Sequence, residues 1–205
     1  MISAIIVAYN EADYIQKIVR ELAKQKYSGR YEIILADGGS TDETVSLIED
    51  QHIEIVHCRK GRACQMNDAA KVAIGDILFF VHADMKLHHN TFSTIQEFIA
   101  QGYAGGGFKN VFGSHNKKIK KLGRWMNFRL FNTSEQSDKG IFYGDNGIFV
   151  SRETFDKLGG FKEIEIMEDY EFSNRMRQEF NVIKIKKIPI TVSARRHIKT
   201  GFWKT

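Results

Sequence analysis

The sequence contains two cysteines, one proline and no long apolar run. Cys58 and Cys64 are too few for a disulfide framework, and they lack the regularly spaced partners that a zinc site needs. They indicate a reducing compartment, and we expect them to pack rather than to react. The uninterrupted apolar stretches, such as residues 77–81, are far shorter than a membrane-spanning helix, and the first residues show neither a basic leader nor a cleavage site. We therefore expect a cytoplasmic protein that is neither secreted nor transmembrane.

Length and charge set broad bounds on the protein. A chain of 205 residues, 42% of them hydrophobic, can bury one substantial core but not two, so we expect a single domain over residues 1–205. The formal net charge of +5 is mild. It suits a ligand that carries phosphates and does not call for a nucleic-acid partner.

Buried strands alternate with amphipathic helices through the first 90 residues. Residues 2–8 are β-branched and almost continuously apolar, as in a strand that is covered on both faces. Apolar residues then recur at helical spacing between residues 15 and 22. The alternation continues, with strands predicted over 31–36, 53–57 and 77–81 and helices over 11–26, 42–50 and 63–73. This pattern predicts an α/β fold with a mostly parallel sheet flanked by helices and right-handed crossovers.

The alternation breaks after residue 90. We expect a helix over 91–101 and a turn at the three glycines of 105–107. The other predicted elements are strands over 108–112 and 141–150, a basic helix over 115–131, helices over 152–158 and 168–180, and a last strand pair around Pro189. The first half therefore has the pattern of a nucleotide-binding sheet, and the irregular second half has the pattern of a region that binds another partner.

Polar residues follow three of the predicted strands. Asn10 and Glu11 follow the first strand, residues 37–42 (DGGSTD) follow the second, and His82 and Asp84 follow the fourth. Open parallel sheets bind ligands at this carboxyl edge, so these residues are candidates for a ligand site. Turns and helix caps explain each segment equally well when it is taken alone. The dinucleotide fingerprint GxGxxG is absent, which argues against a nicotinamide-dependent dehydrogenase.

His82 and Asp84 form the most informative of these segments. With the period of two of a strand, both side chains project from one face while Ala83 points away. An imidazole and a carboxylate placed in this way could share one divalent metal ion, and such an ion takes up the charge that develops on a leaving diphosphate. The other interpretation is a local hydrogen bond from His82 and a turn capped by Asp84. The two residues alone do not decide between these interpretations.

Several segments, in a fixed order, carry a family resemblance. They are 5–11 (IIVAYNE), 32–44 (EIILADGGSTDET), 60–63 (KGRA), 82–84 (HAD), 144–150 (GDNGIFV), 159–161 (GGF) and 167–169 (MED). Together they resemble family 2 glycosyltransferases of the GT-A fold, and most of all a short bacterial subgroup without membrane anchors. The match covers nearly the whole chain. It implies a Rossmann-like sheet with a nucleotide-binding half (1–90) and an acceptor-binding half (91–205).

The resemblance also implies a reaction and a donor site. The reaction is the transfer of a sugar from a nucleotide-diphosphate donor to an acceptor hydroxyl, with a divalent metal ion, Mn²⁺ or Mg²⁺, as cofactor. The implied donor-site residues are Tyr9 and Glu11 beside the nucleoside, Asp37 at the base or ribose, Lys60 or Arg62 at the base or diphosphate, and Asp84 as the metal-binding acid of the DxD motif.

The implied catalytic residue is Asp169, with Glu168 beside it. Asp169 matches the acid that deprotonates the acceptor hydroxyl in inverting members of the family. The chemistry agrees, because a sugar hydroxyl is a poor nucleophile near neutral pH and a positioned carboxylate is the usual general base. An acidic pair is also favoured at any helix start, so the order of the motifs decides for catalysis. A retaining route would need a nucleophile below the sugar, for which Asp145 is the candidate.

Two positions depart from the family pattern. His82 replaces the first acid of DxD, which leaves the metal affinity and the preferred ion open, although an imidazole favours manganese. His197 follows Arg195 and Arg196 at a position where the subgroup commonly has tryptophan. We expect the tail to close over the diphosphate, with the arginines on phosphate oxygens and His197 as a further metal ligand. The alternative is a frayed chain end.

The basic residues 117–126 leave two interpretations open. As a helix, they would carry an apolar stripe flanked by cations, which suits a helix lying on an anionic membrane surface. The same spacing suits a solvated helix packed on the sheet. A lipid-linked acceptor would favour the first interpretation, with peripheral contact at the inner face of the membrane.

Two other functional classes also remain. A sugar-nucleotide pyrophosphorylase shares the architecture, but we expect it to carry a glycine-rich basic loop after the first strand, where this chain has residues 8–11 (AYNE). A non-catalytic nucleotide- or glycan-binding module is the other class, and His82 in place of an acid favours it. The base, the sugar and the acceptor depend on loop shapes after residue 90.

Overall fold

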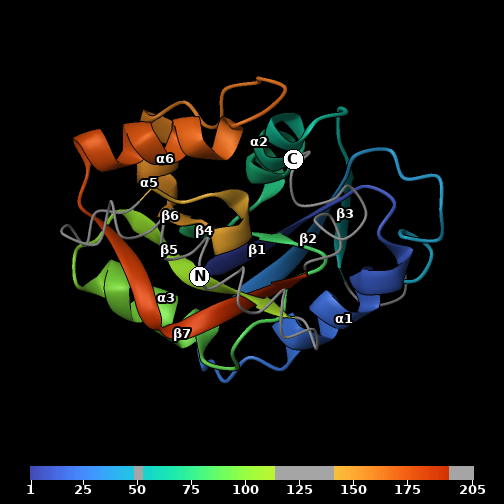
Figure 1. The fold of residues 1–205 in the computed structure, drawn as a ribbon, viewed down its shortest axis with the longest axis horizontal. Helices are drawn as coiled ribbons and strands as arrows, with labels where there is room; N and C mark the ends of the chain where they lie inside the picture. Colours follow the sequence, from blue (N-terminus) through green and yellow to red (C-terminus); the bar gives the residue numbers. More distant parts are fainter. Residues whose placement is uncertain (49–52, 114–140, 194–205) are drawn as a thin grey trace.

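The computed structural model describes residues 1–48, 53–113 and 141–193. They form a seven-stranded sheet in the order β3-β2-β1-β4-β6-β5-β7, with helices on both faces (Figure 1). The predicted basic helix over 115–131 and the tail after residue 193 lie outside the described residues. The α/β prediction with a mostly parallel sheet is confirmed.

The elements follow the predicted alternation through β4, except that β3 follows β2 with no helix between them in the described residues. The strands are β1 (Ile2–Ala8), β2 (Tyr31–Asp37), β3 (Glu54–His57), β4 (Ile77–His82), β5 (Gly105–Gly113), β6 (Phe149–Ser151) and β7 (Val182–Ser193). The helices are α1 (Ala12–Ala23), α2 (Arg62–Val72), α3 (Thr91–Ala100), the 3₁₀ turn η1 (Gly144–Asn146), α5 (Arg152–Lys157) and α6 (Glu168–Glu179).

Strand β1 is the centre of the parallel half. It pairs in parallel with β2 on one side and with β4 on the other, and all seven of its residues are buried. Alternate residues of β1 belong to two hydrophobic clusters, one with α1 and α3 and the other with α2, α5 and α6. Figure 1 shows these two groups of helices on opposite sides of the strands. The continuous apolar sequence of β1 follows from burial on both faces.

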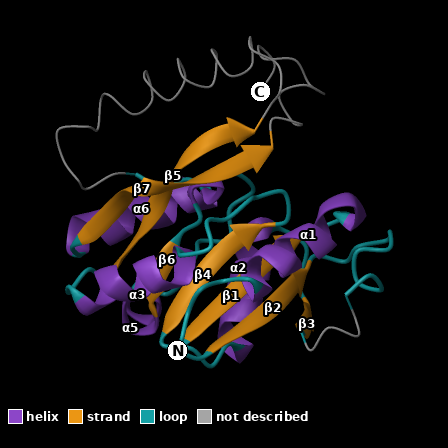
Figure 2. Ribbon diagram, turned by 90° about the horizontal axis from the view of Figure 1, so that it is seen from below, coloured by secondary structure: helices purple, strands orange, loops and turns teal. Residues whose placement is uncertain are grey.

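The second half of the sheet is mixed. Strand β6 pairs antiparallel with both β4 and β5, and β5 pairs in parallel with β7. The glycines of 105–107 were predicted as a turn, and this was wrong because they begin β5. A Cβ at Gly106 would lie 2.0 Å from the carbonyl oxygen of Ile183, so only glycine permits this close strand pairing. Figure 2 shows β5 and β7 running together beyond the edge of the other strands.

Three further predictions of local structure were wrong. Residues 43–48 of the predicted second helix form turns instead of a regular helix, with the Leu47 N–H on the Glu43 carbonyl oxygen (3.0 Å) and the Ile48 N–H on that of Val45 (3.1 Å). The end of that predicted helix lies outside the described residues. Of the predicted strand over 141–150, only the end is extended, as part of β6, and η1 precedes it. The last strand pair is one strand, β7, which continues through Pro189.

Pro189 lies where the pairing of β7 with β5 changes register. Phe108 pairs with Ile185 but Asn110 pairs with Ile190, so β7 has extra residues at this point. Proline has no N–H to donate to a ladder, and a strand irregularity is where it is tolerated. Within the described ranges, none of the helices combines the length and the apolar character needed to cross a lipid bilayer.

Gln65 on α2 ties the carboxyl ends of β1 and β2 together. Its side chain is buried, and its Nε2 donates to the carbonyl oxygens of Ala8 (2.7 Å) and Ala36 (2.9 Å). A Cβ at Gly38 would lie 2.8 Å from Cδ of Gln65, so the loop after β2 needs a glycine at this position. Gln65 therefore sets the geometry of two of the three strand ends that carry predicted site residues.

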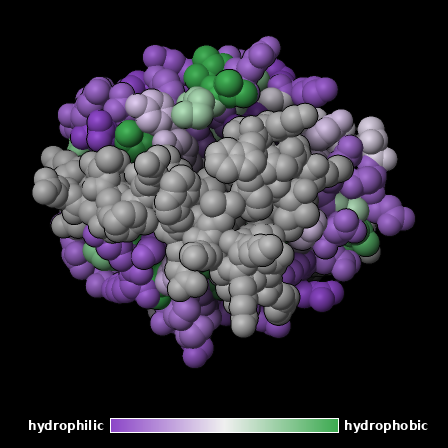
Figure 3. Space-filling view, viewed as in Figure 1, coloured by the Kyte–Doolittle hydropathy of each residue, from purple (hydrophilic) through white to green (hydrophobic). Residues whose placement is uncertain are grey.

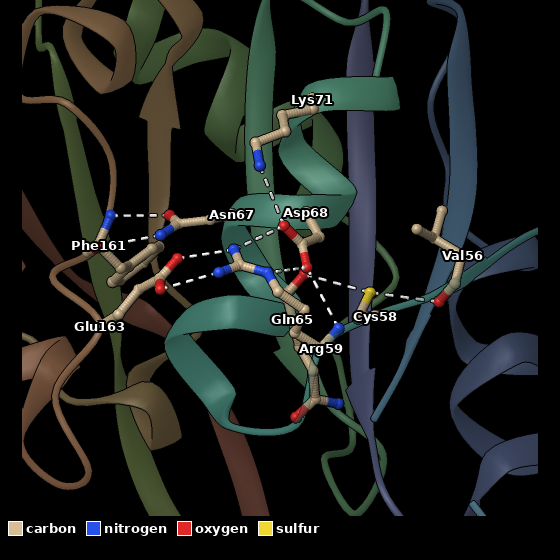
Figure 4. A network of polar contacts seen from close by, with 9 residues as sticks. All are labelled: Val56, Cys58, Arg59, Gln65, Asn67, Asp68, Lys71, Phe161 and Glu163. Atoms are coloured by element: carbon tan, nitrogen blue, oxygen red, sulfur yellow. Dashed lines mark hydrogen bonds and ion pairs between the residues drawn. The ribbon is translucent and has the colours of Figure 1, made fainter. Parts of the chain in front are cut away.

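A polar network holds the loop before α6 against α2 (Figure 4). The Arg59 guanidinium bridges Asp68 (2.8 Å) on α2 and Glu163 (2.7 Å) in that loop. Asn67 donates to the Phe161 carbonyl oxygen (2.8 Å) and accepts the Phe161 N–H (2.9 Å). The loop that leads to the predicted catalytic pair is therefore anchored by side chains of α2 and of the segment before it.

Replacing Gln65 by methionine should destabilise the fold. The change keeps the side-chain volume but leaves two buried carbonyl oxygens without this donor, which costs about 1–3 kcal/mol of unfolding free energy. Gln101→Met, at an exposed position after α3, is the matched control and should stay within about 0.5 kcal/mol of wild type. Urea denaturation measures both. Equal stabilities of the two variants would contradict the role of Gln65.

The Arg59 network predicts acid-sensitive stability. The hydrogen bonds from Arg59, followed by Lys71, hold the pKa of the Asp68 carboxyl well below its usual value of 3.8. Because this pKa is lower in the folded than in the unfolded state, the ionised Asp68 stabilises the fold at pH values above 3.8. This stabilisation is lost as the pH falls below 3.8 toward the pKa of the folded state. The urea midpoint of wild type should therefore exceed that of Asp68→Asn at neutral pH, and the difference should shrink below about pH 4. A difference that does not change with pH would contradict this assignment.

Candidate active site

The predicted site lies at the carboxyl edge of the parallel strands. In the sheet order, β1 stands between β2 and β4, so the loops after these three strands are neighbours. They carry Asn10, Asp37 and Asp84, respectively. The convergence that the sequence predicted for these strand ends is therefore present in the fold.

Asp37 ends β2 and is 2% exposed. Its carboxylate accepts the backbone N–H groups of Gly39 (3.1 Å) and Ser40 (3.1 Å). His57 Nδ1, on the neighbouring β3, lies 3.6 Å from Oδ2 of Asp37. The carboxylate thus shapes the loop after β2, and its remaining lone pairs face the edge where His57 is exposed. The structure gives Asp37 a role within the protein that the sequence prediction did not include.

Asn10 joins the loop after β1 to the loop after β2. It adopts a left-handed backbone conformation with φ of 55°. Its N–H donates to Ser40 Oγ (2.9 Å), and its side-chain oxygen accepts the Thr41 N–H (2.8 Å). The Glu11 N–H donates in the same way to Thr44 Oγ1 (2.7 Å). The sequence named Asn10 as a candidate for a ligand site, whereas the structure shows it joining two loops in a left-handed conformation that asparagine adopts more readily than most residues.

Tyr9 and Lys60 offer an exposed surface beside these loops. The Tyr9 ring is 47% exposed, and Lys60 Nζ lies 5.8 Å from its centroid. An aromatic face with a cation over it can stack on a nucleobase and can attract phosphate. Two of the predicted donor residues are therefore adjacent in the fold.

Arg62 is paired with Glu168. Its Nε lies 2.8 Å from Oε1 and its Nη2 lies 3.2 Å from Oε2 of Glu168, whose side chain is almost fully buried. Two parallel contacts between a guanidinium and a carboxylate fix both groups. The pair joins the start of α2 to the start of α6, which brings the predicted catalytic acids to the carboxyl edge of the sheet.

Asp169 is held by two backbone groups. Its Oδ2 accepts the Gly144 N–H (2.6 Å) and its Oδ1 accepts the Tyr170 N–H (2.6 Å). The residue is 7% exposed and lies in the first turn of α6, where the helix dipole favours an acid. The preceding cap residue, Met167, has a left-handed φ of 65°, which is uncommon for a residue with a side chain. Asp169 is thus fixed in one orientation, and each oxygen keeps a lone pair for a ligand.

The structure corrects the geometry expected for His82 and Asp84. Strand β4 ends at His82, so Ala83 and Asp84 lie in a turn and the alternation of a strand does not apply to them. His82 instead lines a cavity of about 10 Å³ together with Gly144, Glu168 and Asp169. The structure therefore brings His82 to the predicted catalytic pair.

Asp84 is the predicted metal ligand that lies at the strand end. It is half-buried in the turn after β4. Among the described residues, no three His, Cys, Asp or Glu side chains are grouped closely enough to hold a metal ion. A carboxylate oxygen nevertheless fits Mg²⁺ or Mn²⁺, which commonly use one or two protein carboxylates together with substrate phosphates. His197, Arg195 and Arg196 lie outside the described residues.

An apolar rim lies next to the predicted catalytic pair, Glu168 and Asp169. Ile164, Ile166 and Met167, in the loop before α6, are 43%, 73% and 45% exposed, respectively. Figure 3 shows an apolar patch at the edge of the molecule where Figure 1 draws this loop. Exposed apolar side chains that are grouped together are typical of a binding surface.

Comparison with known proteins identifies the family. The family profile described as glycosyl transferase family 2 matches residues 3–159. A dolichyl N-acetyl-alpha-D-glucosaminyl phosphate 3-beta-D-2,3-diacetamido-2,3-dideoxy-beta-D-glucuronosyltransferase of Methanococcus voltae is 27% identical over 91% of this chain and 62% of its own length. An uncharacterized glycosyltransferase of Mycobacterium tuberculosis is 33% identical, but the match covers 40% of this chain and 33% of the relative. The chain thus spans between a third and three fifths of the length of these relatives.

Solved structures share the fold. S. aureus TarS in complex with UDP superposes with a TM-score of 0.75 at 18% identity, covering 94% of this chain and 60% of TarS. The mannosyltransferase PcManGT of Pyrobaculum calidifontis, in complex with GDP-Man and Mn²⁺, gives a TM-score of 0.70 at 20% identity, covering 93% of this chain and 56% of that protein. The chain belongs to glycosyl transferase family 2 and has the GT-A fold.

Proposed function

We propose that this protein transfers a sugar from a nucleotide-diphosphate donor to an acceptor hydroxyl, with inversion at the anomeric carbon and with the help of Mn²⁺ or Mg²⁺. The observation that carries the proposal is the buried Asp169 carboxylate, fixed by the N–H groups of Gly144 and Tyr170 beside the strand ends. A buried carboxylate that is oriented by two contacts and keeps a lone pair on each oxygen suits a general base, which favours an enzyme over a non-catalytic binding module.

The donor site is formed by the loops after β1 and β2. TarS binds UDP and PcManGT binds GDP-Man in their solved complexes, which supports a nucleotide donor for this chain. Tyr9 stacks on the base, Lys60 and the loop at Asp37 contact the ribose or the phosphates, and Glu11 borders the nucleoside. The acidic loop after β1 does not resemble the basic phosphate loop expected of a pyrophosphorylase.

Asp84 would hold the metal ion, with diphosphate oxygens of the bound donor completing its ligands. PcManGT contains Mn²⁺ in its complex, and the Asp84 carboxylate lies at the end of β4. A divalent ion bound there neutralises charge on the leaving diphosphate. The sequence also predicts His82 and His197 as ligands of this ion. His197 lies outside the described residues, so its role stays a prediction.

Asp169 is the general base. The acceptor hydroxyl gives its proton to an Asp169 oxygen as its own oxygen bonds to the anomeric carbon, and the bond to the diphosphate breaks with its electron pair on the leaving group. One base and one displacement suffice for inversion. Glu168 positions this base, because its carboxylate is already engaged with Arg62 and fixes the start of α6.

The acceptor is lipid-linked in our proposal. The rim of Ile164, Ile166 and Met167 beside Asp169 suits an acceptor that has an apolar part. Relatives are named for dolichyl and undecaprenyl phosphate acceptors, which agrees with this class. The acceptor would then reach Asp169 from the side of the loop before α6.

The two donor-site acids should differ in their effect on metal dependence. Asp37→Ala and Asp84→Ala should each weaken binding of UDP or GDP by about 10- to 100-fold, the range for a lost hydrogen bond to a charged group. Only Asp84→Ala should abolish the gain in affinity that Mn²⁺ gives. Calorimetric titration with and without Mn²⁺ measures this, with Asp156→Ala on α5 as the control. Retained metal dependence in Asp84→Ala would remove the metal assignment.

Replacing the base should stop transfer without removing donor binding. Asp169→Asn should lower the transfer rate by about 10²- to 10⁴-fold and leave donor affinity within a few-fold, because the acid acts on the acceptor proton. Asp145→Asn separates the two stereochemical routes and should keep most of the activity. Transfer kinetics with a lipid-phosphate acceptor measures both variants. A fast Asp169→Asn enzyme, or an inactive Asp145→Asn enzyme, would contradict the inverting mechanism.

A further inference from the structure

His82 and Asp169 meet at Gly144. A Cβ at residue 144 would lie 2.5 Å from Nε2 of His82 and 3.3 Å from Oδ2 of Asp169. The imidazole and the carboxylate therefore both face the same α-carbon, and there is no room for a side chain between them. The backbone N–H of Gly144 is the group that holds Oδ2 of Asp169 (2.6 Å). Because this hydrogen bond joins the two residues, a shift of the Gly144 backbone would also move the Asp169 carboxylate.

The charges around His82 explain why an imidazole suits this position. The cavity that His82 lines is otherwise apolar except for Gly144, Glu168 and Asp169. Glu168 is compensated by Arg62, whereas the hydrogen bonds of Asp169 within the described part of the chain come from neutral N–H groups. A carboxylate at position 82 would place a third acid beside Asp169 in a poorly solvated place, where like charges repel strongly.

We propose that His82 is a positioning residue for the base Asp169, acting through Gly144, rather than a ligand of the metal ion. This inference rests on the proposed role of Asp169 as general base. The imidazole packs against Gly144 and keeps its N–H directed at Oδ2 without adding negative charge. Position 82 and Asp84 then serve different parts of the site: Asp84 binds the donor diphosphate with its metal, and His82 supports the group that activates the acceptor.

A near-isosteric pair of variants separates the two roles. His82→Asn removes the imidazole and stays neutral, whereas His82→Asp has nearly the same shape and adds a carboxylate. We expect His82→Asn to lower kcat about tenfold and His82→Asp to lower it by a further tenfold or more, since small misplacements of a reacting group have large effects on rate. The KM for the donor and the Mn²⁺ concentration for half-maximal UDP binding should stay within about twofold in both variants.

A metal-ligand role predicts the reverse order. A carboxylate is a good ligand for Mn²⁺ and an amide is a poor one. If His82→Asp bound UDP and Mn²⁺ as tightly as wild type, or more tightly, and kept a higher kcat than His82→Asn, His82 would belong to the metal site and our proposal would be overturned. Calorimetry of UDP binding gives this result without measuring transfer.

Gly144 provides the matching double-mutant test. Gly144→Ala introduces the Cβ that would meet His82 Nε2, and it should lower kcat strongly in the wild-type background. In the His82→Asn background the shorter side chain leaves room, so the same change should have a clearly smaller effect. Independent, multiplicative losses would show that the two residues do not act through each other and would overturn the proposal.

Failure of this inference can be told apart from failure of the proposed function. If Asp169→Asn remains active, the base assignment itself is wrong and His82 has no base to support. If Asp169→Asn is inactive and the two His82 variants have equal kcat, only the role of His82 is wrong. Thermal unfolding of each variant, with and without UDP and Mn²⁺, shows that lost activity is not lost folding.

Discussion

The parallel pairing of β1 with β2 and β4 is the constraint on which the site depends. Because parallel strands end at the same edge, the loops after these three strands converge, and that edge is the usual ligand site of open α/β sheets. Burial of β1 on both faces makes its register costly to change. Gln65 then fixes the last carbonyl groups of β1 and β2, so that the donor loops start from a defined geometry.

A second set of contacts brings the proposed base, Asp169, to this edge from a distant part of the chain. The Arg62–Glu168 pair joins the starts of α2 and α6, and the Arg59 and Asn67 contacts anchor the loop between α5 and α6. These contacts all involve α2 or the segment just before it. Helix α2 therefore links the ends of β1 and β2 to the proposed catalytic pair, and we expect substitutions on it to affect both binding and chemistry.

The parts of the fold that the sequence predicted are those with strong local patterns. Strands β1, β2 and β4 are buried apolar runs, and their polar ends were located correctly. The helix predicted over 42–50 was wrong in its described part, where residues 43–48 form turns that combine i→i+4 and i→i+3 hydrogen bonds. The glycines of 105–107 were taken for a turn because their close contact with β7 is not visible in the local sequence.

The site was predicted unevenly for the same reason. Ordered motifs pointed to Asp37, Asp84 and Asp169, but the roles of Gln65 and Gly144 depend on residues far away in the chain. Gln65 looks like any polar helix residue, and Gly144 like any turn glycine, until their tertiary contacts are known. His82 was assigned by the period of a strand, and the assumed geometry failed because the strand ends at that residue.

The position of a bound metal ion tests the central claim most directly. Crystals grown with Mn²⁺ and UDP or GDP would give an anomalous signal at the ion. We expect this signal within about 2–2.5 Å of an Asp84 carboxylate oxygen, with diphosphate oxygens as the other ligands. Asp169 should lie on the side of the diphosphate where the donor sugar would be bound. A signal away from Asp84, or a nucleotide bound away from the ends of β1, β2 and β4, would contradict the account.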